Sequence, residues 1–195
     1  SQKRCLAISG THGKTTTSTL LAHILTQSGK GCTAFLGGIS KNYHSNLLLD
    51  KRDYLVAEAD EFDRSFLQLY PEMAVITSTD ADHLDIYSTH NKIKEAFSEF
   101  ASQVKPDGAL IVKKGTDIDL SSAKTKRVYE YSYDIPCDFY ASSIKVLEDG
   151  FFNFDLNYPG GVIKNCTVGI PGWINIENSI AASSIALLEG ISPED

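Results

Sequence analysis

Gly10-Thr11-His12-Gly13-Lys14-Thr15-Thr16 stands between two segments of contrasting pattern. Before it, Arg4–Ser9 is a short apolar run of the kind that forms a buried strand. After it, Lys14–Ser28 repeats apolar residues at helical spacing and is stopped by Gly29. A strand, a glycine turn and a helix therefore follow one another at the start of the chain, which is typical of an α/β fold.

The residue types in this loop suit the binding of a phosphate group. Backbone N–H groups and a helix N-terminus attract an anion, Lys14 can neutralise phosphate oxygens, and the Thr15 hydroxyl can ligate Mg²⁺. The general pattern G-x-x-x-x-G-K-[ST] has glycine where this chain has Ile8, so the loop is a shortened variant. A glycine turn that merely caps a helix is the alternative. The coincidence of strand, Gly-Lys-Thr and helix favours nucleotide phosphate binding.

Further strand and helix patterns follow the first helix. Ile93, Phe97 and Phe100 share one face of a predicted helix over residues 91–104. Short apolar runs predict strands at Cys32–Leu36, Tyr54–Glu58, Ala74–Thr77 and Ala109–Lys113. Such alternation predicts an α/β fold with a mostly parallel, P-loop-type sheet flanked by helices on both faces.

The pattern changes after residue 127. Strand candidates with alternating apolar and polar residues follow at Val128–Tyr133, Phe139–Val146, Phe151–Tyr158 and Val162–Val168. We therefore expect an α/β core over 1–127, a small antiparallel β appendage over 128–170, and a last helix within 171–195. The final residues resemble the start of another capped helix, which predicts that the chain is part of a longer protein.

Acidic residues are concentrated in one window. The 195 residues include 25 carboxylates and 18 cations, a formal net charge of −7. The whole excess falls between residues 58 and 85, where Arg64 is the one cation among the carboxylates. A net-negative chain without a basic tract lacks the electrostatic footprint of a nucleic-acid or anionic-membrane binder. An acidic window in an otherwise balanced chain instead predicts a bound cation.

The sequence shows no membrane or export signal. No apolar run approaches the ~18 residues that a membrane span requires. The first residues also lack the apolar stretch of a signal peptide. We therefore expect a cytoplasmic protein without membrane partners.

Two segments of the acidic window follow predicted buried strands. Glu58 ends one strand, and Asp82-His83-x-Asp85 follows another. Ligands of open α/β sheets lie at the carboxyl ends of strands, which places both segments beside the loop. Mg²⁺ keeps several waters, so one or two carboxylates with phosphate oxygens suffice to bind it. A solvated strand end for Glu58 and a capping role for His83 stay open. No individual role follows for three neighbours: Asp60, Glu61 and Asp63.

Three motifs together carry a resemblance to a known family. They are Gly10–Thr17, the run Glu58-Ala59-Asp60-Glu61-Phe62-Asp63-x-Ser65-Phe66, and the run Asp80-Ala81-Asp82-His83-Leu84-Asp85-Ile86-Tyr87. Through them the chain resembles the central ATPase domain of the Mur ligases, which make the peptide stem of peptidoglycan. Gly172-Trp173-Ile174-Asn175-Ile176-Glu177-Asn178 is similar to the family's adenine-contacting Gly-x-His-Asn-x-x-Asn motif, with Ile174 in place of histidine.

The resemblance implies roles for individual residues. ATP would be held by Gly10, Thr11, His12, Gly13, Lys14, Thr15, Thr16, Asn175 and Asn178. Thr15 and Glu58 would bind one Mg²⁺ and His83 a second one. Lys14, Glu58 and His83 would thus form the catalytic set. Without the family, Asn175 is a helix N-cap and Asn178 a polar helix residue.

Within the family, the motifs are most similar to the branch that adds L-alanine. The resemblance then implies an ATP-dependent ligase that joins L-alanine to the lactyl carboxylate of UDP-N-acetylmuramate through an acyl phosphate, in peptidoglycan biosynthesis. Phe35-Leu36-Gly37-Gly38-Ile39 is similar to the family's loop facing the sugar nucleotide, or is a plain glycine turn. The family's N-terminal UDP-binding domain and C-terminal domain are not expected in these residues, so this chain alone should be nearly inactive.

Other functions stay open. A recycling ligase of the same family attaches a tripeptide to UDP-N-acetylmuramate and has a similar loop. A P-loop nucleotide-binding module without ligase activity would also share it. A GTPase switch is disfavoured, because Asn91-Lys92-Ile93-Lys94 lacks the aspartate of the guanine-binding Asn-Lys-x-Asp run.

Overall fold

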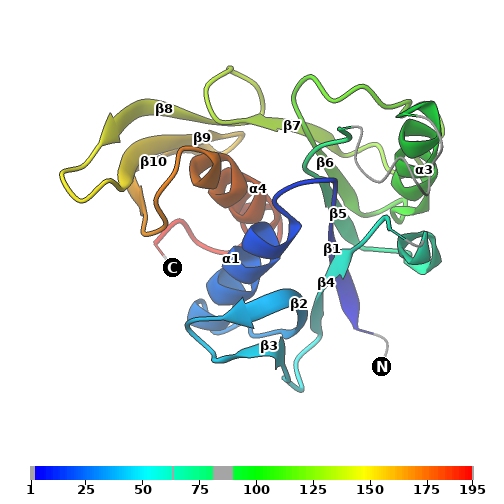
Figure 1. Cartoon of the computed structure of the whole chain (residues 1–195), viewed down its shortest axis with the longest axis horizontal. Coiled ribbons are helices and arrows are strands. Elements are labelled where there is room, and N and C mark those ends of the chain that lie inside the picture. The colour runs from blue at the N-terminus through cyan, green and yellow to red at the C-terminus, as the bar shows by residue number, and fades with distance from the viewer. Residues whose placement is uncertain (1–2, 63, 81–89, 195) are drawn as a thin grey trace.

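A computed structural model describes residues 3–62, 64–80 and 90–194, which form one open sheet with helices on both faces (Figure 1). The strands are β1 (Arg4–Ser9), β2 (Thr33–Ser40), β3 (Ser45–Leu48), β4 (Tyr54–Ala59), β5 (Met73–Ile76), β6 (Ala109–Lys113), β7 (Val128–Ser132), β8 (Phe139–Val146), β9 (Phe152–Tyr158) and β10 (Gly161–Val168). The helices are α1 (Lys14–Gln27), the short 3-10 helix η1 (Ser65–Gln68), α3 (His90–Gln103) and α4 (Ile174–Leu188). The predicted α/β class is confirmed.

The centre of the sheet is parallel. The strand order is β10-β9-β8-β7-β6-β5-β1-β4-β2-β3, and β1 pairs in parallel with both β4 and β5. Ser9, at the end of β1, is in register with Ala59 on one side and Ile76 on the other. The segments that follow these three strands therefore leave the sheet at the same edge, where ligands of open α/β sheets bind.

The two faces of the sheet bury separate cores. Side chains alternate along a strand, so Leu6 and Ile8 of β1 join one cluster and Ala7 the other. The first cluster contains fully buried residues of both α1 and α4, among them Leu21, Leu25 and Ile180. The second contains Ile93, Phe97 and Phe100 of α3, which confirms the helix face expected from their spacing, together with Phe66 of η1.

The C-terminal strands differ from the expected appendage. β7 pairs in parallel with β6 on one side and with β8 on the other, so the antiparallel part begins only at the β8–β9 pair. All of these strands belong to the same sheet as the core. The alternation of apolar and polar residues indicates a half-buried strand but not its direction. The prediction that β7 belongs to the antiparallel group is therefore wrong.

The N-terminal edge also differs from expectation. β2 runs through Gly37 and Gly38 to Ser40, so the Phe35–Ile39 stretch is strand rather than a loop or a glycine turn. β3, which the sequence reading missed, pairs antiparallel with β2 and forms the sheet edge. Glycines in a strand interior often mark a close approach by another group, and Gly37 lies close to the Glu58 carboxylate.

Helix α4 joins the two parts of the sheet. It packs against α1 and also contacts β5 through β10, so it covers both parallel and antiparallel strands on one face of the sheet (Figure 1). Its residues Ile176, Ile180 and Ile185 are fully buried. Among the described helices, none combines the length and apolarity that crossing a bilayer requires.

Truncating α4 inside this core should destabilise the domain. We expect Ile180→Ala to lower the free energy of unfolding by about 2–5 kcal/mol, because it removes buried methyl groups and leaves a cavity. Ile174→Ala is the matched control: the same residue type on the same helix is 41% exposed, and its truncation should cost under about 1 kcal/mol. Urea denaturation followed by circular dichroism measures both. Equal losses would contradict the packing described for α4.

Candidate nucleotide-binding site

The loop after β1 needs both of its glycines. Gly10 and Gly13 have φ of 125° and 82°, in the region that disfavours residues with a Cβ. A Cβ on Gly10 would lie 2.1 Å from Oγ1 of Thr77, and a Cβ on Gly13 would lie 2.5 Å from Oδ1 of Asn178. The loop is thus packed closely against the segment after β5 at Gly10 and against the start of α4 at Gly13. Lys14 then begins α1, so the helix N-terminus opens at the loop.

Residues after β5 hold the loop in place through hydrogen bonds. The Thr11 N–H donates to the Ser78 carbonyl (3.1 Å), and the His12 N–H donates to Oγ of Ser78 (3.0 Å). The hydroxyls of Thr11 and Ser78 are 2.8 Å apart, and Oγ1 of Thr77 donates to the Ser9 carbonyl (3.1 Å). The sequence reading missed Thr77 and Ser78 as site residues. The available signal was a Thr-Ser-Thr run directly after a buried strand.

Lys14 extends across the loop toward two acidic residues. Its Nζ donates to the Gly10 carbonyl (2.8 Å) and lies 2.8 and 3.1 Å from the two carboxylate oxygens of Glu61. Oδ1 of Asp60 is 4.0 Å away. The ammonium therefore sits over the loop, in the place where it can meet a phosphate that the loop amides bind.

Glu58 is held by three donors. The Ser18 hydroxyl (2.7 Å) and the Gly37 N–H donate to Oε1, and the Thr15 hydroxyl donates to Oε2 (3.0 Å). A Cβ on Gly37 would lie 2.5 Å from Oε2 of Glu58 and 2.7 Å from Oγ1 of Thr15. The glycine therefore lets β2 approach the carboxylate closely. The Glu58 side chain extends from β4 and is held in place by donors from α1 and β2.

The Thr15–Glu58 pair fits a magnesium ion. Both offer hard oxygen ligands, and Mg²⁺ commonly takes one or two protein oxygens and completes its shell with phosphate and water. Within the described ranges, no group of three or more His, Cys, Asp or Glu side chains is arranged to hold a metal by itself. His83, the predicted ligand of a second ion, lies in the 81–89 segment, outside the described residues.

The two asparagines predicted to contact adenine lie at the start of α4. Asn175 is the second residue of the helix, whose N-cap is Trp173, so the N-cap assignment for Asn175 is wrong. Its Nδ2 donates to the Pro171 carbonyl (2.8 Å), and Nδ2 of Asn178 donates to its Oδ1 (3.1 Å). Thr17 of α1 donates to Oδ1 of Asn178 (3.4 Å). Asn178 thus lies against the loop at Gly13, and Asn175 accepts a hydrogen bond from Asn178.

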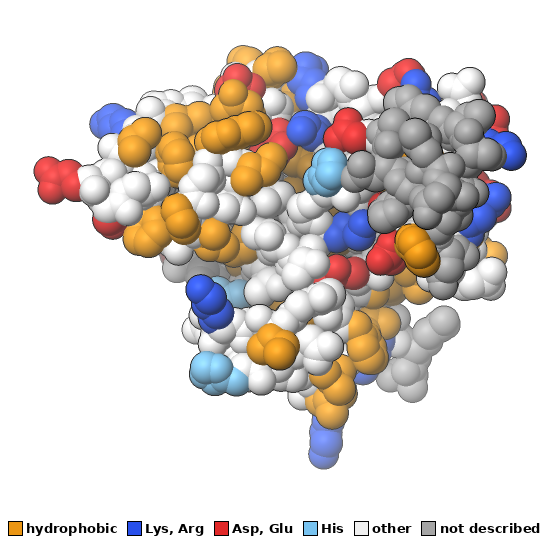
Figure 2. Space-filling model, in the orientation of Figure 1, with side chains coloured by type: hydrophobic (Ala, Val, Ile, Leu, Met, Phe, Trp, Pro, Cys, Tyr) orange, Lys and Arg blue, Asp and Glu red, His pale blue; other side chains and the backbone are white. Residues whose placement is uncertain are grey.

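The other predicted residues border the loop. The His12 ring is exposed, with Nε2 3.7 Å from an exposed carboxylate oxygen of Asp80. Thr16 is half-buried in the first turn of α1. Figure 2 shows acidic, basic and histidine side chains gathered on this face beside the atoms that are not described. The site is therefore polar and carries both signs of charge.

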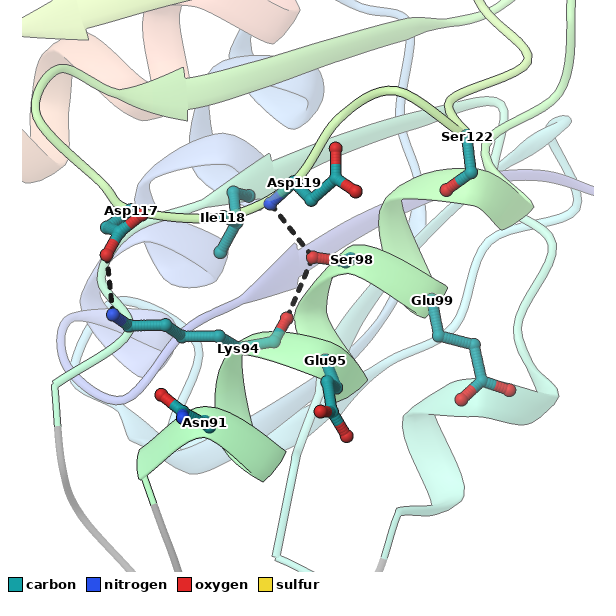
Figure 3. Close-up of a pocket in the computed structure, with 9 residues that line it drawn as sticks. All are labelled: Asn91, Lys94, Glu95, Ser98, Glu99, Asp117, Ile118, Asp119 and Ser122. Carbon is teal, nitrogen blue, oxygen red and sulfur yellow. Dashed lines mark hydrogen bonds and ion pairs between the residues drawn. The ribbon is translucent and has the colours of Figure 1, made fainter.

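Two open pockets lie beside the carboxyl end of β6. One, of about 300 Å³, runs from Ser78 and Asp80 at the phosphate loop to Lys94 and Lys113. The other, of about 520 Å³, lies between α3 and the segment after β6 (Figure 3). Lys94 borders both and pairs with Asp117. The smaller pocket adjoins the loop through Ser78.

Comparison with known sequences identifies related proteins. A family model described as the Mur ligase middle domain matches residues 8–186. A UDP-N-acetylmuramate–L-alanine ligase of Parabacteroides distasonis is 51% identical over 193 residues, covering 98% of this chain and 42% of the relative. Its counterpart from Porphyromonas gingivalis is 49% identical, covering 99% of this chain and 42% of the relative. The chain thus spans about two-fifths of the length of these curated relatives.

Solved structures show the same fold. A UDP-N-acetylmuramate–alanine ligase of Thermotoga maritima superposes with a TM-score of 0.81 at 24% identity, over 98% of this chain and 43% of that one. A UDP-N-acetylmuramate:L-alanyl-γ-D-glutamyl-meso-diaminopimelate ligase of Neisseria meningitides superposes with a TM-score of 0.84 at 24% identity, over 98% and 63%. Because the family model covers most of the residues, this chain belongs to the Mur ligases and is a middle domain of that family.

Proposed function

We propose that this chain is the ATP-binding domain of a ligase that joins L-alanine to the lactyl carboxylate of UDP-N-acetylmuramate. The observation that carries the proposal is the meeting of Lys14, Thr15 and Glu58 at one edge of the sheet, beside loop amides at a helix N-terminus. This set can hold a polyphosphate and a magnesium ion together, as an ATP-dependent ligase requires.

The chemistry of the proposed reaction brings negative charges together. The substrate carboxylate attacks the γ-phosphorus of ATP, which gives an acyl phosphate and releases ADP. The amine of L-alanine then attacks the acyl carbon, inorganic phosphate leaves, and the amine loses a proton as the amide forms. Lys14 and the loop amides would offset the repulsion between the carboxylate and the polyphosphate. Thr15 and Glu58 would hold Mg²⁺, which supplies further positive charge to the phosphate oxygens when it is bound. Asn175 and Asn178 would contact the adenine, a role supported by the packing of Asn178 against Gly13 of the loop.

Sequence similarity favours L-alanine over a tripeptide. The relatives from Parabacteroides distasonis and Porphyromonas gingivalis are both named UDP-N-acetylmuramate–L-alanine ligases and are about half identical to this chain. The tripeptide-adding relative from Neisseria meningitides has a similar fold, but at 24% identity its likeness supports the fold alone. The amino-acid specificity would reside in the full-length protein, of which this chain forms a part.

Removing Lys14, the cation of the loop, should slow the reaction. In the full-length protein, Lys14→Ala should lower the rate of ADP formation by about a hundredfold or more, because the transferred phosphoryl group loses its fixed cation. The circular dichroism spectrum should be unchanged. Lys41→Ala, which removes an exposed lysine after β2, is the control and should leave the rate unaltered. Full activity of Lys14→Ala would contradict the assignment of the loop.

Binding of a metal ion at Thr15 and Glu58 should stabilise the folded protein. Mg²⁺ together with a non-hydrolysable ATP analogue should raise the melting temperature of the full-length protein more than either ligand alone, because ligands that bind only the folded state stabilise it. Glu58→Gln should remove the Mg²⁺-dependent part of this shift. Glu148→Gln, at an exposed turn after β8, should retain it. Differential scanning fluorimetry measures all of these shifts, and an unchanged shift in Glu58→Gln would rule out the proposed ligand.

The choice of substrates tests the proposed reaction. Given UDP-N-acetylmuramate and ATP, the full-length protein should release ADP rapidly with L-alanine, and only slowly with the tripeptide or with glycine. GTP should not replace ATP. A coupled assay for ADP or GDP measures the rates. Preference for the tripeptide would identify a recycling ligase instead, and no ADP release with any of these amines would indicate a nucleotide-binding module that lacks ligase activity.

A further inference from the structure

Glu61 is buried although it carries an ionisable carboxyl group. Its side chain is 1% exposed, and its two oxygens lie 2.8 and 3.1 Å from Nζ of Lys14. A buried carboxylate is costly unless it is paired and hydrogen-bonded. The sequence assigns no role to Glu61, which there is one of several neighbouring acidic residues. In the folded domain it forms a two-oxygen contact with the lysine of the phosphate loop.

Lys14 has little hydrogen-bonding capacity to spare. An ammonium group has three N–H donors. The Gly10 carbonyl accepts one of them at 2.8 Å, and the Glu61 carboxylate occupies another. The Lys14 side chain is 14% exposed, so little of it is open to solvent. A phosphate that enters the loop therefore meets a cation that a buried carboxylate has already neutralised.

We propose that Glu61 is a positioning residue that holds Lys14 in place and thereby lowers the affinity of the loop for nucleotide. In the empty loop Glu61 satisfies the ammonium, so a phosphate gains less by binding it. Without that carboxylate, Lys14 would be a poorly solvated cation, and a phosphate would relieve it. Nucleotide should then bind more tightly. Turnover should fall, because Lys14 would no longer be held over the transferred group.

This inference rests on the proposed function, since it takes nucleotide phosphates as the anions that reach Lys14. Asp60 provides a matched comparison. Its carboxylate lies 4.0 Å from the same Nζ, but the side chain is 59% exposed. Exposed ion pairs contribute little to energetics because water screens them. Replacing Asp60 by Asn therefore removes the same charge next to the same lysine without removing a buried contact.

The test compares Glu61→Gln with Asp60→Asn in the full-length protein, with ADP and Mg²⁺ as the probe in isothermal titration calorimetry. Glu61→Gln should lower the Kd for ADP by about threefold or more, since it removes a full charge from a low-dielectric contact. Its KM for ATP should fall and its kcat should drop by about tenfold. Asp60→Asn should stay within about twofold of the wild type in each constant.

A double-mutant cycle shows whether the effect passes through Lys14. In a Lys14→Gln background, Glu61→Gln should change the Kd by less than about twofold, because the cation that Glu61 neutralises is gone. A merely structural role of Glu61 would change the Kd equally in both backgrounds. Should Glu61→Gln fail to fold, Glu61→Asp replaces it, because the shorter side chain withdraws the carboxylate and predicts a smaller change in the same direction.

The outcomes separate the two proposals. If the wild-type protein does not bind ADP, the proposed function fails. If it binds ADP but Glu61→Gln or Glu61→Asp leaves the Kd unchanged or raises it, only the role of Glu61 is overturned. Tighter binding of the Glu61 variant, lost in the Lys14→Gln background, supports the inference.

Discussion

The parallel pairing of β1 with β4 and β5 is the constraint on which the site depends. Because the three strands end in register, the loop after β1, the acidic run after β4 and the Thr-Ser-Thr run after β5 emerge at one edge. Lys14 meets Glu61 there, and Thr11 meets Ser78. A shift of one residue in either pairing would exchange the two faces of a strand and separate these partners.

The sequence predicted the elements with strong periodicity. The strand, glycine loop and helix at residues 4–27, and the aromatic face of α3, follow from apolar spacing that matches one kind of element. Strand direction and the identity of neighbouring strands could not be predicted from the local pattern. β7 has the alternation of a half-buried strand, yet its neighbours are parallel, because pairing is decided by contacts far apart in the chain. The short edge strand β3 carried no clear pattern.

The site was predictable as residue types but not as contacts. Gly-Lys-Thr and Glu58 follow from their positions at strand ends, since phosphate and magnesium chemistry limits the suitable residues. Nothing in the order of Glu58, Asp60 and Glu61 tells which of them is buried. The structure separates them: Glu58 turns toward α1 and β2, Asp60 is exposed, and Glu61 lies on Lys14. Likewise, the contact between Asn178 and Gly13 depends on the packing of α4 beside α1, which the sequence pattern does not indicate.

The three donors on Glu58 have a consequence for ion selectivity. A carboxylate has about four lone-pair sites, and Ser18 and Gly37 occupy Oε1 while Thr15 takes one position on Oε2. An incoming ion would find a single free position and bind in a monodentate manner. Calcium, which often takes both oxygens of a carboxylate and a large coordination shell, would have to break these hydrogen bonds. A small octahedral ion that keeps its waters would not, so in the proposed magnesium site the Gly37 amide would favour such an ion over calcium.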